Sequence, residues 1–220
     1  MKKIVLSVIA LWLFTQNNFS ICPASSAGEM NTTVKSLTFD QKKRLINIAR
    51  KTVELFVHTG KVYQVNDKDP RMSEEEGTFV TLRNQGQLRG CIGNILGRGP
   101  LYLLVRDMAI GAAAEDPRFS PVREDELSNI EVEVSVLSKP WVTKNIDDIT
   151  MGVHGVIVSR GMFNQGVFLP QVATETGWDK DQFLSELCSQ KAGLPSDCYK
   201  DPTTTIRIFT ADVFSEKDLK

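Results

Sequence analysis

Apolar side chains recur at intervals of three or four in three parts of the chain, which is the spacing of one buried helix face. The three predicted helices are residues 39–58, Leu101–Ala114 and the segment from Asp179 to Cys188. Thr38 and Gln41 have the spacing of an N-terminal capping box. The second helix is apolar nearly all round and stops at Asp116-Pro117, so we expect it to be central.

Residues 130–136 alternate strictly between apolar and polar side chains, which predicts a strand with one buried and one exposed face. Val132, Val134 and Val136 are expected in the core, with Glu131, Glu133 and Ser135 on the other face. Two hairpins are predicted, over 78–83 with 87–92 and over 156–159 with 166–169, and a last strand over 204–209. Hairpins beside separate helices indicate an α+β fold with a mainly antiparallel sheet. Residues 59–77 are expected to form a loop.

The composition places the chain among folded globular proteins. It has 220 residues, 41% of them hydrophobic, with 26 Lys plus Arg against 27 Asp plus Glu. A chain of this size buries enough surface to fold without a metal or disulfide. The near-neutral charge excludes a protein that tracks nucleic-acid phosphates, so no nucleic-acid partner is expected.

The first 27 residues have the pattern of a secretory signal peptide. Lys2 and Lys3 precede an apolar run, Ile4–Phe14, that is too short to span a membrane. Small residues at Ser25 and Ala27 predict cleavage before residue 28. We therefore expect a periplasmic or secreted protein without a membrane anchor, with residues 28–38 as an N-terminal tail.

Removal of this segment leaves three cysteines in a compartment that permits disulfides. Cys188 lies on the third predicted helix, and Cys198 follows the reversal Ala192-Gly193-Leu194-Pro195. The reversal brings the two chain segments together, so we predict a Cys188–Cys198 disulfide. Cys91 is the remaining free thiol.

The stretch Leu88-Arg89-Gly90-Cys91-Ile92-Gly93 is the strongest candidate for a functional site. On a strand, Arg89 and Cys91 share a face, and a neighbouring guanidinium favours the nucleophilic thiolate. Gly90 and Gly93 leave the backbone around the sulfur without side chains, so a ligand can approach. The alternative is that Cys91 is a small core residue and the glycines serve close packing.

This stretch and four further motifs resemble the AMMECR-like domain family, called AmmeMemoRadiSam system protein A in prokaryotes. The other motifs are Ala114–Phe119, Glu133–Leu137, Leu169–Ala173 and Lys191–Pro195, in the same order as in the family. The resemblance covers residues 39–215. It implies an α+β fold with a larger and a smaller subdomain, and an association with a Memo-like protein and a radical S-adenosylmethionine protein.

The resemblance carries the family's candidate binding residues onto this chain but supplies no reaction. These residues are Arg89, Gly90, Gly93, Glu115, Asp116, Arg118 and Phe119, with Cys91 as the candidate catalytic group. We expect the Cys91 strand and the Glu115–Phe119 turn to form the walls of one cleft, in which Arg118 holds an anionic group. The leading interpretation is a ligand- or partner-binding module. The alternatives are an enzyme that uses Cys91 as a nucleophile or redox thiol, and a purely structural domain.

The remaining patterns point to no cofactor or metal. Gly97-Arg98-Gly99-Pro100 lacks the spacing of a phosphate-binding loop and is expected to be a turn. His58 and His154 are the only histidines and have no zinc-site spacing. Either histidine is a base for Cys91 only if the fold brings it within about 3 Å of the sulfur.

Overall fold

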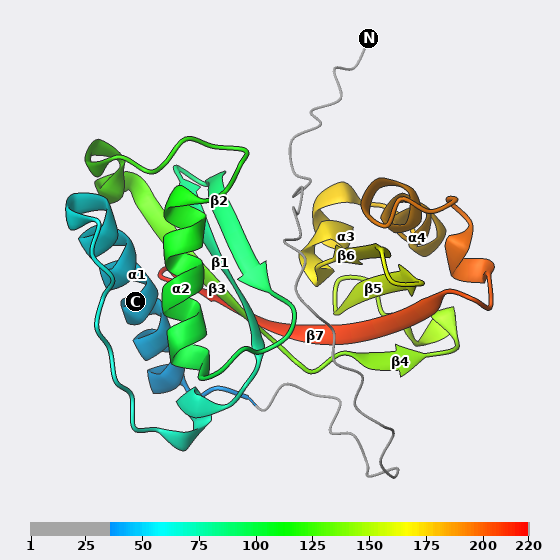
Figure 1. Ribbon diagram of the computed structural model, residues 1–220, viewed down its shortest axis with the longest axis horizontal. Coiled ribbons are helices and arrows are strands. Elements are labelled where there is room, and N and C mark those ends of the chain that lie inside the picture. The colour runs from blue at the N-terminus through cyan, green and yellow to red at the C-terminus, as the bar shows by residue number, and fades with distance from the viewer. Residues whose placement is uncertain (1–35, 220) are drawn as a thin grey trace.

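The structure, a computed structural model, describes residues 36–219, which form two subdomains around one continuous antiparallel sheet (Figure 1). The larger subdomain comprises residues 36–137 and 211–219, and the smaller one comprises residues 138–210. The predicted signal peptide and most of the predicted tail lie outside the described residues.

Every strand pair in the sheet is antiparallel, and the strand order is β2-β1-β3-β7-β5-β6, with β4 paired to β7. The strands are β1 Gly77–Asn84, β2 Gln87–Asn94, β3 Ile130–Leu137, β4 Trp141–Thr143, β5 His154–Arg160, β6 Asn164–Phe168 and β7 Thr205–Ser215. Both predicted hairpins are present, as β1-β2 and β5-β6. The predicted α+β class with an antiparallel sheet is confirmed.

Two helices, α1 Phe39–Thr59 and α2 Leu101–Ala114, pack on one face of the sheet of the larger subdomain. Their apolar stripes meet the valines of β3 in one core, in which Val132, Val134 and Val136 are fully buried as predicted. The bounds of both helices agree with the sequence prediction because their caps and stop signals are local.

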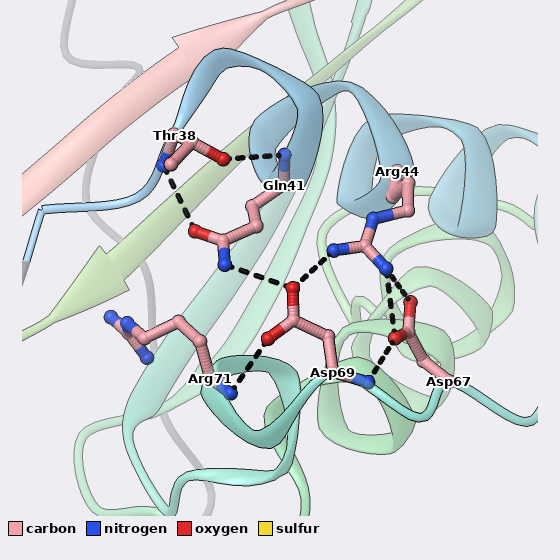
Figure 2. Close-up of polar contacts among 6 residues, drawn as sticks. All are labelled: Thr38, Gln41, Arg44, Asp67, Asp69 and Arg71. Atoms are coloured by element: carbon pink, nitrogen blue, oxygen red, sulfur yellow. Dashed lines mark hydrogen bonds and ion pairs between the residues drawn. The ribbon is translucent and has the colours of Figure 1, made fainter.

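The first turn of α1 is fixed by a polar network (Figure 2). Thr38 and Gln41 form the predicted capping box, in which each side chain accepts a hydrogen bond from the other residue's backbone N–H. The Gln41 side chain also donates to Asp69, and Arg44 pairs with both Asp69 and Asp67. These contacts tie residues 67–69 of the predicted loop to the helix, directly before a 3₁₀ turn at Pro70–Ser73.

The smaller subdomain packs the helices α3 Pro170–Thr176 and α4 Lys180–Glu186 against β5 and β6. α4 continues as a π-helical turn, Leu187–Lys191, where one regular helix was predicted through Cys188. The predicted disulfide is present: Cys188 and Cys198 are bonded, with their Cα atoms 5.8 Å apart. Both cysteines are fully buried, so the bond lies inside the core of this subdomain.

The two subdomains meet through a small apolar cluster and share β7. Phe79 and Leu137 of the larger subdomain pack against Ile157 and Phe209 of the smaller one. The first half of β7 pairs with β4 and β5, and its second half, from Ala211, pairs with β3. The chain crosses between the subdomains at residues 138 and 210, which hydrogen-bond to each other twice.

The expectation that the second face of β3 is exposed was only partly correct. Glu131 and Glu133 are half-buried, whereas Ser135 is 1% exposed. Ser135 lies opposite Phe79 on β1, and Phe79 packs against the smaller subdomain. The strand is therefore covered on both faces towards its C-terminal end, which periodicity within one strand does not reveal.

Candidate functional site

Cys91, Thr81 and Glu133 form a row across three neighbouring strands of the larger subdomain. Thr81 of β1 is the register partner of Cys91 on β2 and of Glu133 on β3. Opposed residues in an antiparallel pair point to the same face, which here is the face away from α1 and α2. The Thr81 hydroxyl donates to the Cys91 sulfur at 3.3 Å. The candidate cysteine therefore lies on a polar strip.

Asp116 links this row to the turn after α2. Its Oδ2 accepts the backbone N–H of Cys91 at 2.9 Å and the Nη2 of Arg118 at 2.7 Å. Its Oδ1 accepts the backbone N–H and the Nε of Arg118. β2 is an edge strand, so the carboxylate satisfies an N–H that has no strand partner. The turn and the Cys91 strand are thus brought together, while the cleft predicted between them stays a prediction.

The charges in this network follow from burial and hydrogen bonding. Burial opposes the ionisation of Asp116, but the hydrogen bonds from Arg118 and from the Cys91 N–H outweigh it and hold the Asp116 pKa below its ordinary value. The same carboxylate raises the pKa of Arg118. Arg118 is therefore a permanent cation, held in place beside the Cys91 strand.

Burial raises the pKa of the Cys91 thiol above its ordinary value. The Thr81 hydrogen bond and the Arg118 charge oppose this shift, whereas Asp116 and Glu133 add to it. The expectation of a thiolate favoured by its surroundings was therefore wrong. At neutral pH the group is a thiol.

The strand pattern predicted that Arg89 lies beside the Cys91 sulfur. In the structure the Arg89 side chain binds other partners. Its guanidinium binds both carboxylate oxygens of Glu126, at 2.7 and 2.9 Å, and donates to the carbonyls of Ser120 and Pro121. This pair lowers the pKa of Glu126 to about 2. Arg89 fastens the segment after the turn to β2, which is a structural role.

The two glycines of the motif are sites of close packing rather than open backbone. A Cβ at Gly90 would lie 2.1 Å from the carbonyl oxygen of Ala112 on α2. A Cβ at Gly93 would lie 2.3 Å from the ring of Phe79. The hypothesis that these glycines admit a ligand was wrong, and the packing alternative explains both.

The smaller subdomain contributes charged and polar groups to the same region. Glu175 of α3 approaches Arg83 of β1 at 4.0 Å. Lys191, in the π-helical turn, has its Nζ 6.0 Å from the centre of the Phe168 ring. Burial, with the charge of Arg118 across the boundary, lowers the pKa of Lys191 to about 8. We call the group of Cys91, Asp116, Arg118, Glu133, Glu175 and Lys191 the intersubdomain cluster.

The other predicted residues lie around this cluster. The centre of the Phe119 ring lies 5.3 Å from Cζ of Arg118 and 5.9 Å from Cζ of Arg89, so the ring neighbours both guanidinium groups. Glu115 is exposed and ends α2 through its backbone N–H.

Both histidines have contacts elsewhere in the fold. His58 faces Glu124, and His154 packs edge-on against Trp141. The structure thus supports neither of them as a base for the thiol.

Two surface hollows of the described residues are lined by residues other than Cys91. They have volumes of about 530 and 520 Å³ and flank the β1-β2 turn at Gln85, on the side of Asn129. The second is lined by Arg89 and Glu126, both already paired. Within residues 36–219, no three His, Cys, Asp or Glu side chains are grouped to hold a metal ion. In the same range, no helix has the length and hydropathy needed to cross a membrane.

Three members of the cluster were not singled out from the sequence as site residues: Glu133, Glu175 and Lys191. Glu133 and Lys191 lie inside motifs that carry the family resemblance, so a signal for both was present in the chain. The alternation pattern by itself had placed Glu133 on the exposed face of a strand. Glu175 stands outside every motif and is brought in by its approach to Arg83 of β1.

Comparison with known proteins assigns the chain to a family. The model of the AMMECR1 family matches residues 46–214. A protein of Thermococcus gammatolerans is 44% identical over 79% of this chain and 89% of its own length, and one of Methanothermobacter thermautotrophicus is 43% identical over 82% and 96%. The crystal structure of the uncharacterized protein PH0010 from Pyrococcus horikoshii superposes with a TM-score of 0.74, at 40% identity, over 80% of this chain and 91% of that one. The chain belongs to the AMMECR1 family.

Proposed function

We propose that this protein is a binding module whose intersubdomain cluster holds a ligand or partner protein, with Cys91 as a neutral contact. The observation that carries the proposal is the state of the thiol: burial raises its pKa, and the sulfur accepts a hydrogen bond from the Thr81 hydroxyl. A nucleophilic cysteine needs a lowered pKa or an adjacent base. A polar surface built from both subdomains is instead suited to recognition.

The thiol is tested by alkylation with iodoacetamide between pH 5 and pH 9. We expect slow labelling of Cys91 whose rate still rises at pH 9, because the thiolate is the reacting species and its fraction is small. Arg89→Ala should not slow the reaction, because Arg89 is paired with Glu126. Fast labelling that levels off below pH 8, or labelling that depends on Arg89, would support the enzyme alternative.

We also propose the two partners that the family resemblance implies, a Memo-like protein and a radical S-adenosylmethionine protein. The purified partners from the same organism are tested for binding by biolayer interferometry. Lys191→Glu reverses a charge in the cluster and should abolish binding, whereas Lys51→Glu makes the same change on the exposed side of α1 and should not. No binding by either partner, or equal binding by both variants, would contradict this assignment.

Export is a further part of the proposal, because residues 1–27 have the signal-peptide pattern described above. N-terminal sequencing of protein recovered from the periplasm or medium should begin at residue 28. Recovery of the protein with Met1 intact, or in the membrane fraction, would contradict export.

A further inference from the structure

The turn between β5 and β6 carries two large apolar side chains that the fold leaves in solvent. Met162 is 87% exposed and Phe163 is 84% exposed. No other large apolar side chain in the range 36–219 is more than 55% exposed, and the other exposed ones stand singly on different segments. Single exposed apolar side chains are common on protein surfaces, whereas an adjacent pair with this exposure indicates a contact site.

This turn projects from the sheet. The last register pair of the hairpin joins Arg160 to Asn164, so only Gly161, Met162 and Phe163 lie beyond the paired strands. A Cβ at Gly161 would have no described atom within 4 Å apart from its chain neighbours, which indicates open space around the turn. The two apolar side chains therefore stand on a narrow, convex tip.

The strand ends below the turn are tied to the rest of the smaller subdomain. Arg160 donates to the Thr204 Oγ1 from Nε at 3.1 Å and from Nη2 at 2.8 Å, and its Nη2 pairs with Asp201 at 2.9 Å. The Asn164 side chain donates to the Ala192 carbonyl at 3.1 Å. The turn is thus held on a fixed base, so that a contact there costs little ordering of the strands.

The size of the apolar pair is too small for a protein interface of ordinary stability. Large side chains bury at least about 150 Å² each, so the pair offers roughly 300 Å². Two copies of the chain that met at this turn would bury about 600 Å² in total, whereas stable protein interfaces bury about 1,200 Å² or more. A lipid surface requires no matching protein area, because apolar side chains enter it one by one.

The charge beside the turn favours no particular lipid headgroup. Arg160 is the charged residue next to the turn, and Asp201 neutralises it. Attraction to anionic lipid requires basic residues whose charge is not cancelled nearby. The apolar side chains are therefore the main source of binding free energy for this contact.

We propose that Met162 and Phe163 insert into the interfacial layer of a lipid bilayer, in a contact that is separate from the intersubdomain cluster and does not rest on the binding function above. A single myristoyl chain gives only marginal, reversible membrane binding, and these two side chains are shorter. The protein is therefore released when membranes are washed. The contact sets the orientation of the protein at a membrane and does not anchor it.

Phe163→Trp tests the insertion by placing an indole at the turn. The variant is made in the chain from residue 28, which keeps every described residue and lacks the apolar run 4–14, itself a lipid-binding sequence. Addition of phosphatidylcholine vesicles should shift the emission of this indole to shorter wavelengths, and brominated phosphatidylcholine should quench it. The same chain without the substitution gives the background from Trp141 and Trp178. An indole emission that vesicles leave unchanged would overturn the proposal.

A second variant assigns vesicle binding to the two side chains. Met162→Ser combined with Phe163→Ser removes both and should weaken binding at least roughly tenfold in a vesicle sedimentation assay. Leu96→Ser is the matched control, because Leu96 is 55% exposed on a loop of the larger subdomain, and it should bind as the unchanged chain does. Equal binding by the double variant, or an equal loss in Leu96→Ser, would refute the assignment.

The remaining occupants of the turn are separated by two measurements. Binding to phosphatidylcholine vesicles should be the same within about twofold when phosphatidylglycerol is added or the salt is raised, because the charge beside the turn is cancelled. Binding that requires phosphatidylglycerol and disappears in salt would overturn the proposal. Sedimentation equilibrium without lipid should show a monomer, and a dimer that the double variant abolishes would assign the turn to a second copy of the chain instead.

Discussion

Asp116→Asn tests whether one carboxylate organises the candidate site. Asp116 is 4% exposed and accepts four hydrogen bonds, one from the Cys91 N–H and three from Arg118. Asparagine has the same shape but only one acceptor oxygen, so two of the four donors would face an NH₂ group. Hydrogen bonds to a charged group contribute about 1.5–3 kcal/mol each. Because Arg118 is partly exposed and can turn to water, we take the lower value for each bond.

The expected loss is about 3 kcal/mol in the free energy of unfolding, from two hydrogen bonds at about 1.5 kcal/mol each. Urea denaturation at pH 7, followed by circular dichroism, measures it. The pKa of Asp116 lies below its ordinary value of 3.8 in the folded protein, so its contribution is present above that pH and is lost as the pH falls through the folded pKa. The difference between the two proteins should therefore shrink in acid.

Asp125→Asn is the matched control, because Asp125 and its partner Arg123 are both exposed. This variant should unfold at the same urea concentration as the unchanged protein. An Asp116→Asn variant that loses less than about 1 kcal/mol, or a difference that does not depend on pH, would refute the hydrogen-bond argument.

Three other predictions follow from the packing and charge of the same structure. Gly90→Ala should destabilise the protein by about 2 kcal/mol or more, measured by urea denaturation, because its Cβ meets the Ala112 carbonyl of α2. Replacing Cys188 and Cys198 together with alanine should cost about 2.7 kcal/mol in the same assay, the entropy of a loop closed over a separation of 10 residues. Glu133→Gln should raise the free energy of unfolding at pH 7 and leave it unchanged at pH 3. Burial raises the Glu133 pKa, so the cost of its charge appears only as the pH rises through that value. A gain in stability at pH 3 and none at pH 7 would contradict this prediction.

The elements predicted from the sequence are those whose signals are local. The capping box at Thr38 and the stop at Asp116-Pro117 define their helices without help from the rest of the chain. α3 was missed because it has only seven residues, from Pro170 to Thr176, and its position depends on packing against β5. β7 is longer than predicted, because its second half is specified by pairing with β3.

The candidate site could be predicted only in part, for a similar reason. The approach of Asp116 to Cys91 was expected from two motifs, and the hydrogen bond between them confirms it. The pairing of Arg89 with Glu126 was not predicted, because alternation along a strand gives the face on which a side chain lies and not its partner. Glu126 lies 37 residues further along the chain. The effect of the Arg118 charge on the pKa of Lys191 depends on how the two subdomains pack, which no local pattern encodes.

β7 has a mechanical consequence for recognition. The smaller subdomain is inserted into the larger one, and the two chain crossings, at residues 138 and 210, are clamped by reciprocal hydrogen bonds. One crossing is the uninterrupted strand itself, and the other is hydrogen-bonded to it, so both resist a swing of one subdomain against the other. Any relative movement has to be absorbed as twist in a hydrogen-bonded strand. A ligand or partner that binds between the subdomains therefore meets a preassembled surface. Little of its binding free energy is lost to domain closure.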